Sequence, residues 1–293
     1  MERKTLNIVL ATAAVALAAA VYFSQKKEDQ GPPLTPITAA TLDRVSLEHP
    51  GSPTVKLERK GGLWKITEPV QADADPFEVN AFIDLAKQEV KKSLELNAVS
   101  LKDLGLTTPA YTVTLNDQKI GFGAQEPIQA RRYLLVGGKV ALVEDPPAEA
   151  LDADYSDLVS RTLLPTTAEI QSIALPGLNI AKSADAKSWI LAPEDANAGA
   201  DARQKLIDSW KSARALWNAA LPKDGIKGDD VSVTLKGGTV IKFVVTARDP
   251  QLVIARPDIG VSYTLSKELV DEMLKLQDKE SNAVADKAAK PAS

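Results

Sequence analysis

Gly61-Gly62-Leu63-Trp64-Lys65-Ile66-Thr67-Glu68-Pro69 is the stretch that decides the fold, because it joins a glycine turn, a short strand and a proline that ends the strand. Asp73 and Asp75 follow it and precede a helical pattern. A second version, Ala186-Lys187-Ser188-Trp189-Ile190-Leu191-Ala192-Pro193, precedes Asp201 and another helical pattern. This recurrence predicts a duplicated unit.

The helix of the first unit is expected to begin at Asp75, which can cap it, with Pro76 at the first helical position. Apolar residues at positions 79, 83, 86 and 90 continue at helical spacing. Alternating patterns predict a set of strands around this helix. They are expected at residues 42–48, 54–59, 64–66, 111–115, 119–122, 132–136 and 140–143.

The second unit repeats this order. Asp201 is expected to open a helix that carries Trp210 and Trp217 along one side. Core packing explains these two tryptophans, and an interface anchor is the alternative, because tryptophan is favoured at binding hot spots. Strands are expected at residues 170–175, 178–181, 188–191, 231–235, 240–246, 252–255 and 261–265.

Matching residues in the two units support the duplication. The sequence therefore predicts an α+β fold of two tandem repeats, each with antiparallel strands and one main helix, behind an N-terminal transmembrane helix. The repeats are expected at residues 41–164 and 165–276. Pairs at nearly the same spacing are Trp64 and Trp189, Asn97 and Asn218, Lys102 and Lys223, and Val113 and Val233.

An apolar run at residues 6–23 follows Arg3 and Lys4 and is long enough for a bilayer core. It predicts an inner-membrane anchor at residues 1–24, with the N-terminus inside and the body in the periplasm. A cleaved signal peptide, with Ala18 and Ala20 at the cleavage site, is the alternative. Residues 25–40 are expected to be a solvated, proline-rich linker and residues 277–293 a disordered tail.

Composition excludes several functions of this 293-residue chain. Its net charge of −4 argues against nucleic-acid binding, which needs a basic face. The absence of cysteine excludes disulfides, thiol catalysis and iron–sulfur clusters. Because apolar residues make up 44% of the chain, a substantial core is expected.

Chemically reactive motifs are scarce. His49, the one histidine, is expected to be an exposed loop residue, and no G-x-S-x-G motif accompanies it. Gly121-Phe122-Gly123 lacks the third glycine of a dinucleotide fingerprint. The acidic clusters fit helix caps and solvated faces better than a calcium loop or a hydrolase pair. No catalytic, cofactor-binding or metal residue is predicted.

Two further segments carry a resemblance to a known family. Leu104-Gly105-Leu106-Thr107-Thr108-Pro109 precedes a strand, and Arg161-Thr162-Leu163-Leu164 closes the first unit. Together with the Trp64 stretch they resemble the bacterial membrane-anchored family called domain of unknown function 4340. Members are often encoded beside ABC-type transporter subunits related to gliding-motility auxiliary proteins. The resemblance implies an accessory role in the cell envelope and carries over no catalytic residues.

The predicted function is a non-enzymatic, membrane-tethered, extracytoplasmic accessory or scaffold module of an ABC-type transport or cell-envelope complex. Its expected partners are the inner membrane, through residues 6–23, and transporter subunits, with no cofactor and no nucleic acid. The alternative is a periplasmic module that binds a glycan, lipid or peptide between the repeats. If the units have diverged, the acidic turn at Asp73 and Asp75 is where to look first. The structural landmarks are Trp64, Trp189, Asp75, Asp201, Gly105 and Pro109.

Overall fold

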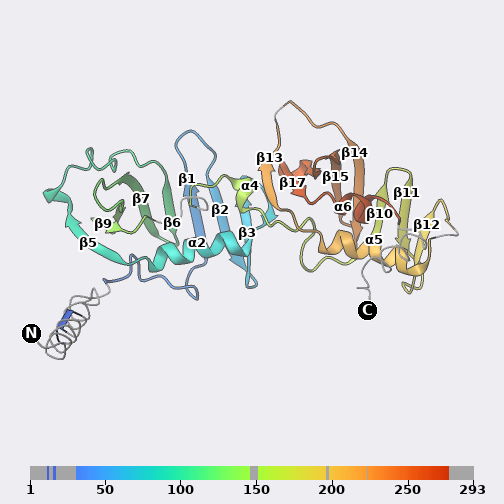
Figure 1. Ribbon diagram of the computed structural model, residues 1–293, viewed down its shortest axis with the longest axis horizontal. Coiled ribbons are helices and arrows are strands. Elements are labelled where there is room, and N and C mark those ends of the chain that lie inside the picture. Colours follow the sequence, from blue (N-terminus) through green and yellow to red (C-terminus); the bar gives the residue numbers. More distant parts are fainter. Residues whose placement is uncertain are drawn as a thin grey trace, which may run out of the picture.

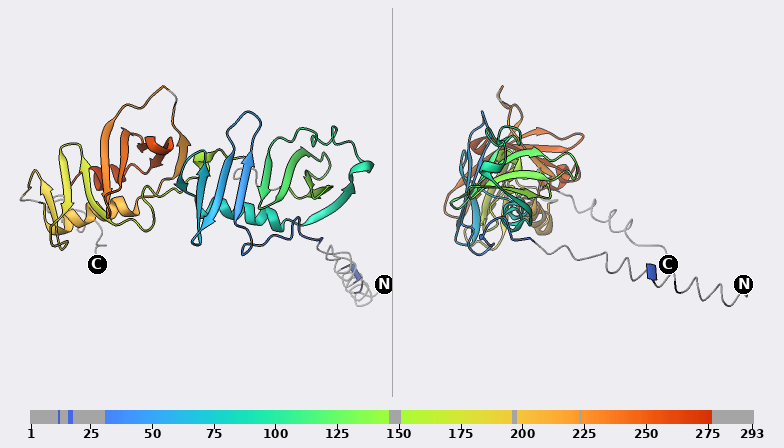
Figure 2. Two further views of the ribbon diagram at one scale, coloured as in Figure 1. Left: turned by 180° about the vertical axis from the view of Figure 1, so that it is seen from behind. Right: turned by 90° about the vertical axis from the view of Figure 1, so that its left-hand side faces the viewer.

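The computed structural model describes residues 12, 16–17, 31–145, 151–195, 198–222 and 224–276. Two antiparallel sheets lie side by side along the long axis of the molecule, which gives it an elongated shape (Figure 1). The view from behind shows the same end-to-end arrangement (Figure 2). Each sheet contributes buried side chains to a hydrophobic core that continues through the junction between them.

The first sheet has nine strands in the order β4-β3-β2-β1-β6-β7-β8-β9-β5. Its strands alternate buried and exposed side chains where one face covers the core, as in β1, where Val45 and Leu47 are buried. The bounds are β1 Arg44–Glu48, β2 Val55–Lys60, β3 Leu63–Glu68, β4 Ala72–Asp73, β5 Val90–Glu95, β6 Thr112–Leu115, β7 Gln118–Gln125, β8 Arg132–Val136 and β9 Lys139–Val143.

Helix α2 (Pro76–Lys87) connects β4 and β5, which form the two opposite edges of the first sheet. It therefore crosses the strands, along the lower side of the sheet in Figure 1. Val79, Phe82 and Leu85 are buried on its inner side. Asp75 is its N-cap and Pro76 its first residue, so the predicted start of this helix is confirmed.

The second sheet has eight strands in the order β12-β11-β10-β14-β15-β16-β17-β13. Helix α5 (Ala200–Ser212) again connects the two edge strands, so the two sheets share one strand order around a crossing helix. The bounds are β10 Ile170–Leu175, β11 Leu178–Lys182, β12 Trp189–Ala192, β13 Trp217–Ala220, β14 Asp229–Leu235, β15 Val240–Ala247, β16 Leu252–Arg256 and β17 Val261–Leu265. The short elements are η1 Leu96–Ala98, α4 Tyr155–Leu158, η2 Pro257–Ile259 and α6 Leu269–Leu274.

The predicted α+β fold class is wrong, because the structure consists mainly of two large antiparallel sheets against which the helices are minor elements. Three strands were not predicted: the two-residue β4 and the longer β5 and β13. Val90 continues the helical spacing of α2 but begins β5, and Trp217 begins β13 after α5 has ended. One proposed match also fails, since Asn97 lies in η1 whereas Asn218 lies within β13.

The membrane predictions need a separate correction. The expected anchor at residues 6–23 lies outside the described residues, apart from Thr12, Ala16 and Leu17. Across the part of the chain that the structure describes, no helix is both long enough and apolar enough to cross a membrane. This finding contradicts the predicted transmembrane helix and the single-pass inner-membrane localisation. The tail at residues 277–293, expected to be disordered, lies outside the described residues.

Part of the predicted linker packs against the first sheet instead of lying in solvent. Leu34 and Ile37 are buried, and the Leu34 amide donates to the carbonyl oxygen of Gln88 at 2.7 Å. The amide of Val90, at the start of β5, donates to the carbonyl oxygen of Pro32 at 2.9 Å. Residues 32–37 therefore cover the outer edge of the first sheet, which would otherwise expose unpaired backbone groups.

Candidate functional site

The segment Val159-Ser160-Arg161-Thr162 lies between the two sheets and bonds to both. Val159 forms a bridge with Ala74, and the Ser160 amide donates to the carbonyl oxygen of Asp73 at 2.7 Å. On the other side, Thr162 forms a bridge with Arg214. Because it pairs with a segment on each side, this stretch joins the β4 edge of the first sheet to the β13 side of the second.

Asp75 is the most buried acidic residue of this junction, with 1% of its surface exposed. One carboxylate oxygen accepts a hydrogen bond from the amide of Phe77 at 2.9 Å and so caps α2. The other accepts from Arg214 Nη2 at 2.9 Å. A single side chain thus holds both the first helix and the second unit.

Glu78 and Arg161 form a second ion pair across the same junction, at 2.9 Å. Arg161 also donates through Nη1 to the carbonyl oxygen of Leu216 at 3.2 Å. Burial raises the pKa of the Glu78 carboxyl, and the neighbouring Arg161 opposes this effect in part. The attraction between Glu78 and Arg161 is therefore offset in part by the free energy needed to remove the Glu78 carboxylate from water.

Side chains and backbone make further bonds across the junction. Asn218 Nδ2 donates to the carbonyl oxygen of Val159 at 2.8 Å, and the Tyr155 hydroxyl donates to that of Gly260 at 2.8 Å. A hollow of about 170 Å³ remains between the units, lined in part by Asp73, Arg256 and Tyr263. This volume is little more than half of the roughly 300 Å³ at which typical ligand pockets begin.

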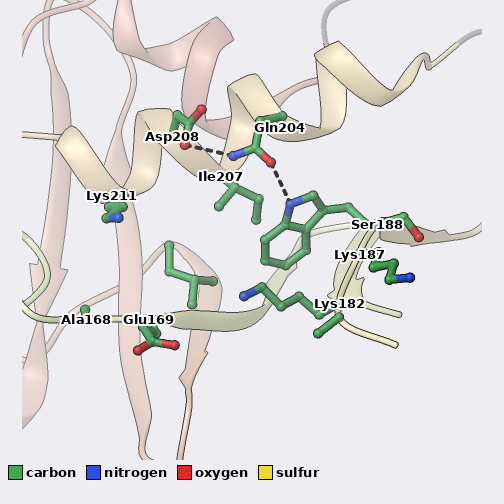
Figure 3. A pocket seen from close by; sticks show the side chains of 12 residues that line it. Ala168, Glu169, Lys182, Lys187, Ser188, Gln204, Ile207, Asp208 and Lys211 are labelled. Carbon is green, nitrogen blue, oxygen red and sulfur yellow. Dashed lines mark hydrogen bonds between the residues drawn. The ribbon is translucent and has the colours of Figure 1, made fainter. Parts of the chain in front are cut away.

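Trp189 lines a second candidate site, a hollow of about 290 Å³ between α5 and the β10–β12 side of the second sheet (Figure 3). Its indole Nε1 donates to Gln204 Oε1 at 3.0 Å, and Gln204 Nε2 donates to Asp208 Oδ1 at 2.9 Å. Lys182 Nζ lies 5.6 Å from the centroid of the indole, within range of a cation–π contact. The indole is therefore fixed at its edge, beside an ammonium group.

The other landmarks have packing roles and are not brought together at one site. Trp64, on β3, is partly buried and packs against the core. Gly105 has φ +67, which favours glycine, and a Cβ there would lie a tight 3.1 Å from the Ala124 amide nitrogen. Pro109 packs closely over Gly121. Asp201 lies exposed in the first turn of α5, whose N-cap is Gly199.

His49 is not the exposed loop residue predicted, since only 19% of its side chain is exposed. Its Nε2 lies 2.7 Å from Asp152 Oδ1, and its ring stacks on Tyr111 with centroids 5.4 Å apart. Burial raises the pKa of Tyr111 to about 12. Within the described ranges, no three histidine, aspartate or glutamate side chains gather as a metal site.

Sequence reasoning missed the two arginines that complete the junction. Arg161 stood in the segment that carries the family resemblance, and this was the only signal for it. Arg214 belongs to no motif and follows the end of α5, so its pairing with Asp75 becomes visible only when the two units are placed together.

Fold and junction define a class of protein, a tandem of two antiparallel sheets joined edge to edge by an ion-paired strand segment. The chain matches the family described as "Domain of unknown function (DUF4340)" over residues 64–224. It therefore belongs to this family, so the family membership that the sequence indicated is confirmed. Searches of curated proteins and of solved structures found no match.

Proposed function

We propose that this protein is a non-enzymatic accessory or scaffold module of an ABC-type transport or cell-envelope complex. The observation that supports the proposal is the junction at Asp75, where one carboxylate bonds both α2 and Arg214. Domains within a chain move relative to each other by default, unless a substantial interface holds them. A scaffold needs its binding surfaces at a fixed distance and orientation, and a bonded junction of this kind supplies both.

The choice of partner rests on the family resemblance, which implies neighbouring ABC-type transporter subunits. The side chains at the junction are compatible with a non-enzymatic role. The acidic groups at the junction form structural bonds, and one of them, Asp75, is almost fully buried. We therefore assign no catalytic step to the protein.

Co-purification tests this proposal directly. The tagged full-length chain, at its native level of expression and in a mild detergent, should recover transporter subunits. Asp75→Ala should recover fewer subunits, because it loosens the junction, whereas Asp201→Ala on the second helix should recover as many as the wild type. Recovery of the wild-type chain without partners would contradict the proposal.

The second candidate, a module that binds a glycan, lipid or peptide between the units, has less support. The hollow at the junction measures about 170 Å³ and is lined by one aromatic side chain, Tyr263. A thermal-shift screen separates the two candidates. A glycan, lipid or peptide that stabilises the wild type but not a variant with Tyr263→Phe would favour ligand binding at the junction over the scaffold role.

A further inference from the structure

The hollow at Trp189 lies away from the junction and has no part in the proposed scaffold role. It is lined by the indole of Trp189, which is half-buried and donates through Nε1 to Gln204, as the dashed line in Figure 3 marks. Its wall carries the carboxylates of Asp208 and Glu169, which can accept hydrogen bonds. Tryptophan presents a broad apolar face, so this combination suits a ligand with one apolar face and several hydroxyl groups.

The charge of the hollow is positive. Lys182, Lys187 and Lys211 line it, and none of them forms an ion pair within the described part of the chain. Glu169 is already paired with Lys236 at 2.8 Å. The hydrogen bond from Lys236 is the main reason that the pKa of Glu169 is lowered, and the charges of Lys182 and Lys211 add to this effect. The positive charges of Lys182 and Lys211 are therefore both felt at the Glu169 carboxylate.

In the first sheet, the cation beside the matching tryptophan, Trp64, is not available to a ligand. Arg59 lies opposite Trp64 in the strand pairing, as Lys182 lies opposite Trp189. However, Arg59 Nε and Nη2 both donate to Asp43 Oδ1, at 3.0 and 2.8 Å. Its guanidinium also donates to the carbonyl oxygens of Ala39 and Ala40. The available ammonium beside the indole is thus a property of the second sheet.

We propose that the Trp189 hollow binds an acidic sugar, such as one uronic acid unit of a polysaccharide. The indole would stack on the apolar face of the sugar ring, and Asp208 would accept from a hydroxyl group. Lys182 and Lys211 would bind the sugar carboxylate. A free phosphate fits less well, because it has no apolar face to stack on the indole and because the cations are lysines rather than the forked guanidinium that recognises phosphate in pairs of bonds.

Binding of methyl glucuronide to the full-length protein tests the proposal, with saturation-transfer NMR as the measurement. The matched probes are methyl glucoside, which lacks the charge, and inorganic phosphate, which lacks the sugar and is tested as a competitor of methyl glucuronide because it has no carbon-bound protons. Methyl glucuronide should bind about two- to fivefold more tightly than methyl glucoside, as expected for solvent-exposed charge pairs. Equal binding of the two glycosides, stronger binding of phosphate, or no binding of the glucuronide would overturn the proposal.

Two variants place the binding at this hollow. Lys182→Gln and Lys211→Gln should each weaken methyl glucuronide binding by about two- to fivefold and leave methyl glucoside unchanged. Lys205→Gln is the matched control, because Lys205 is exposed on the same helix and does not line the hollow. An equal loss in Lys205→Gln, or no loss in the other two variants, would show that the sugar binds elsewhere. Because neither lysine belongs to the junction, failure of this test would leave the scaffold proposal unaffected.

Discussion

Trp64 and Trp189 hold the same place in the two sheets, each on a strand that follows a turn and precedes the crossing helix. Their surroundings differ. The carbonyl oxygen of Trp64 accepts from the Ala74 amide at 3.0 Å, so the backbone beyond β4 continues towards the junction. The carbonyl oxygen of Trp189 accepts instead from the side chain of Arg203 at 2.9 Å. The first sheet is therefore extended past Trp64 by backbone pairing. In the second sheet, a side chain of α5 bonds to the edge strand that carries Trp189.

The helix starts differ in the same way. Asp75 caps α2 and pairs with Arg214, whereas the N-cap of α5 is Gly199, which has no side chain to cap the helix, and Asp201 is exposed. The two sheets share one strand order around a crossing helix. Only in the first does the acidic residue at the start of that helix bond to the other unit. The comparison teaches that the place where two similar units differ is the place where one unit binds the other.

Replacing the two aspartates gives the largest expected difference. Asp75→Ala should lower the free energy of unfolding by about 2 to 3 kcal/mol, because it removes a helix cap and a charged hydrogen bond to a partly exposed arginine. Asp201→Ala should change it by less than about 0.5 kcal/mol, as is usual for an exposed surface residue. Urea unfolding followed by circular dichroism measures both values.

The same experiment can separate the two roles of Asp75. Asp75→Asn keeps a side-chain oxygen that can cap the helix but removes the charge that pairs with Arg214. It should therefore fall between the wild type and Asp75→Ala. If the alanine variants of Asp75 and Asp201 proved equally stable, the junction would not depend on the acidic turn and the comparison would fail.

Replacing the cations opposite the tryptophans should produce a smaller effect. Arg59→Met should cost about 1 to 2 kcal/mol, since it removes bonds to Asp43 and to two backbone carbonyl oxygens. Lys182→Met should cost less than about 1 kcal/mol, the range of an exposed cation–π contact. The melting temperatures of the two variants measure the difference. If both variants lost the same stability, Lys182 would be bonded within the fold as firmly as Arg59, and the contrast between the two sheets would fail.

Local signals account for the parts of the fold that the sequence predicted. Asp75-Pro76 marks the start of α2 because a cap and a helix-compatible proline act within one turn. Many strands were found because their apolar residues alternate along a single segment. Trp210 is completely buried and donates to the carbonyl oxygen of Met273, so its predicted place in the core is confirmed.

The errors come from contacts that are distant in sequence. Trp217 is seven residues after Trp210 and fits the helical stripe, yet it lies on edge strand β13 with 47% of its surface exposed. Its alternative role as an interface anchor remains a prediction. Leu34 lies in a segment rich in proline, and only the exposed edge of the first sheet gives it a buried place. Neither the exposure of Trp217 nor the burial of Leu34 can be predicted from the residues next to it in the sequence.

The smallest expected effect is the contribution of Glu78 to the pH dependence of stability. This dependence shows whether Glu78 is shielded from water at the junction. Burial raises the pKa of Glu78 in the folded state above the unfolded value of about 4.5. The folded chain therefore binds this proton more tightly than the unfolded chain. As a result, stability contributed by Glu78 is present below the unfolded pKa and is lost as the pH rises through the folded pKa. Glu78→Gln should make the fall in stability above about pH 4.5 less steep.

Arg161→Met provides the opposite change. Arg161 partly offsets the raised pKa of Glu78, so its removal should raise this pKa further and extend the fall in stability to higher pH. Asp157, whose pKa is also raised by burial, contributes a slope of the same sign and should keep the Glu78→Gln profile from becoming flat. Urea unfolding at a series of pH values measures all three profiles. If Glu78→Gln and the wild type had the same slope, the glutamate would be solvated, and the junction would then be open to water at the point where α2 meets the second unit.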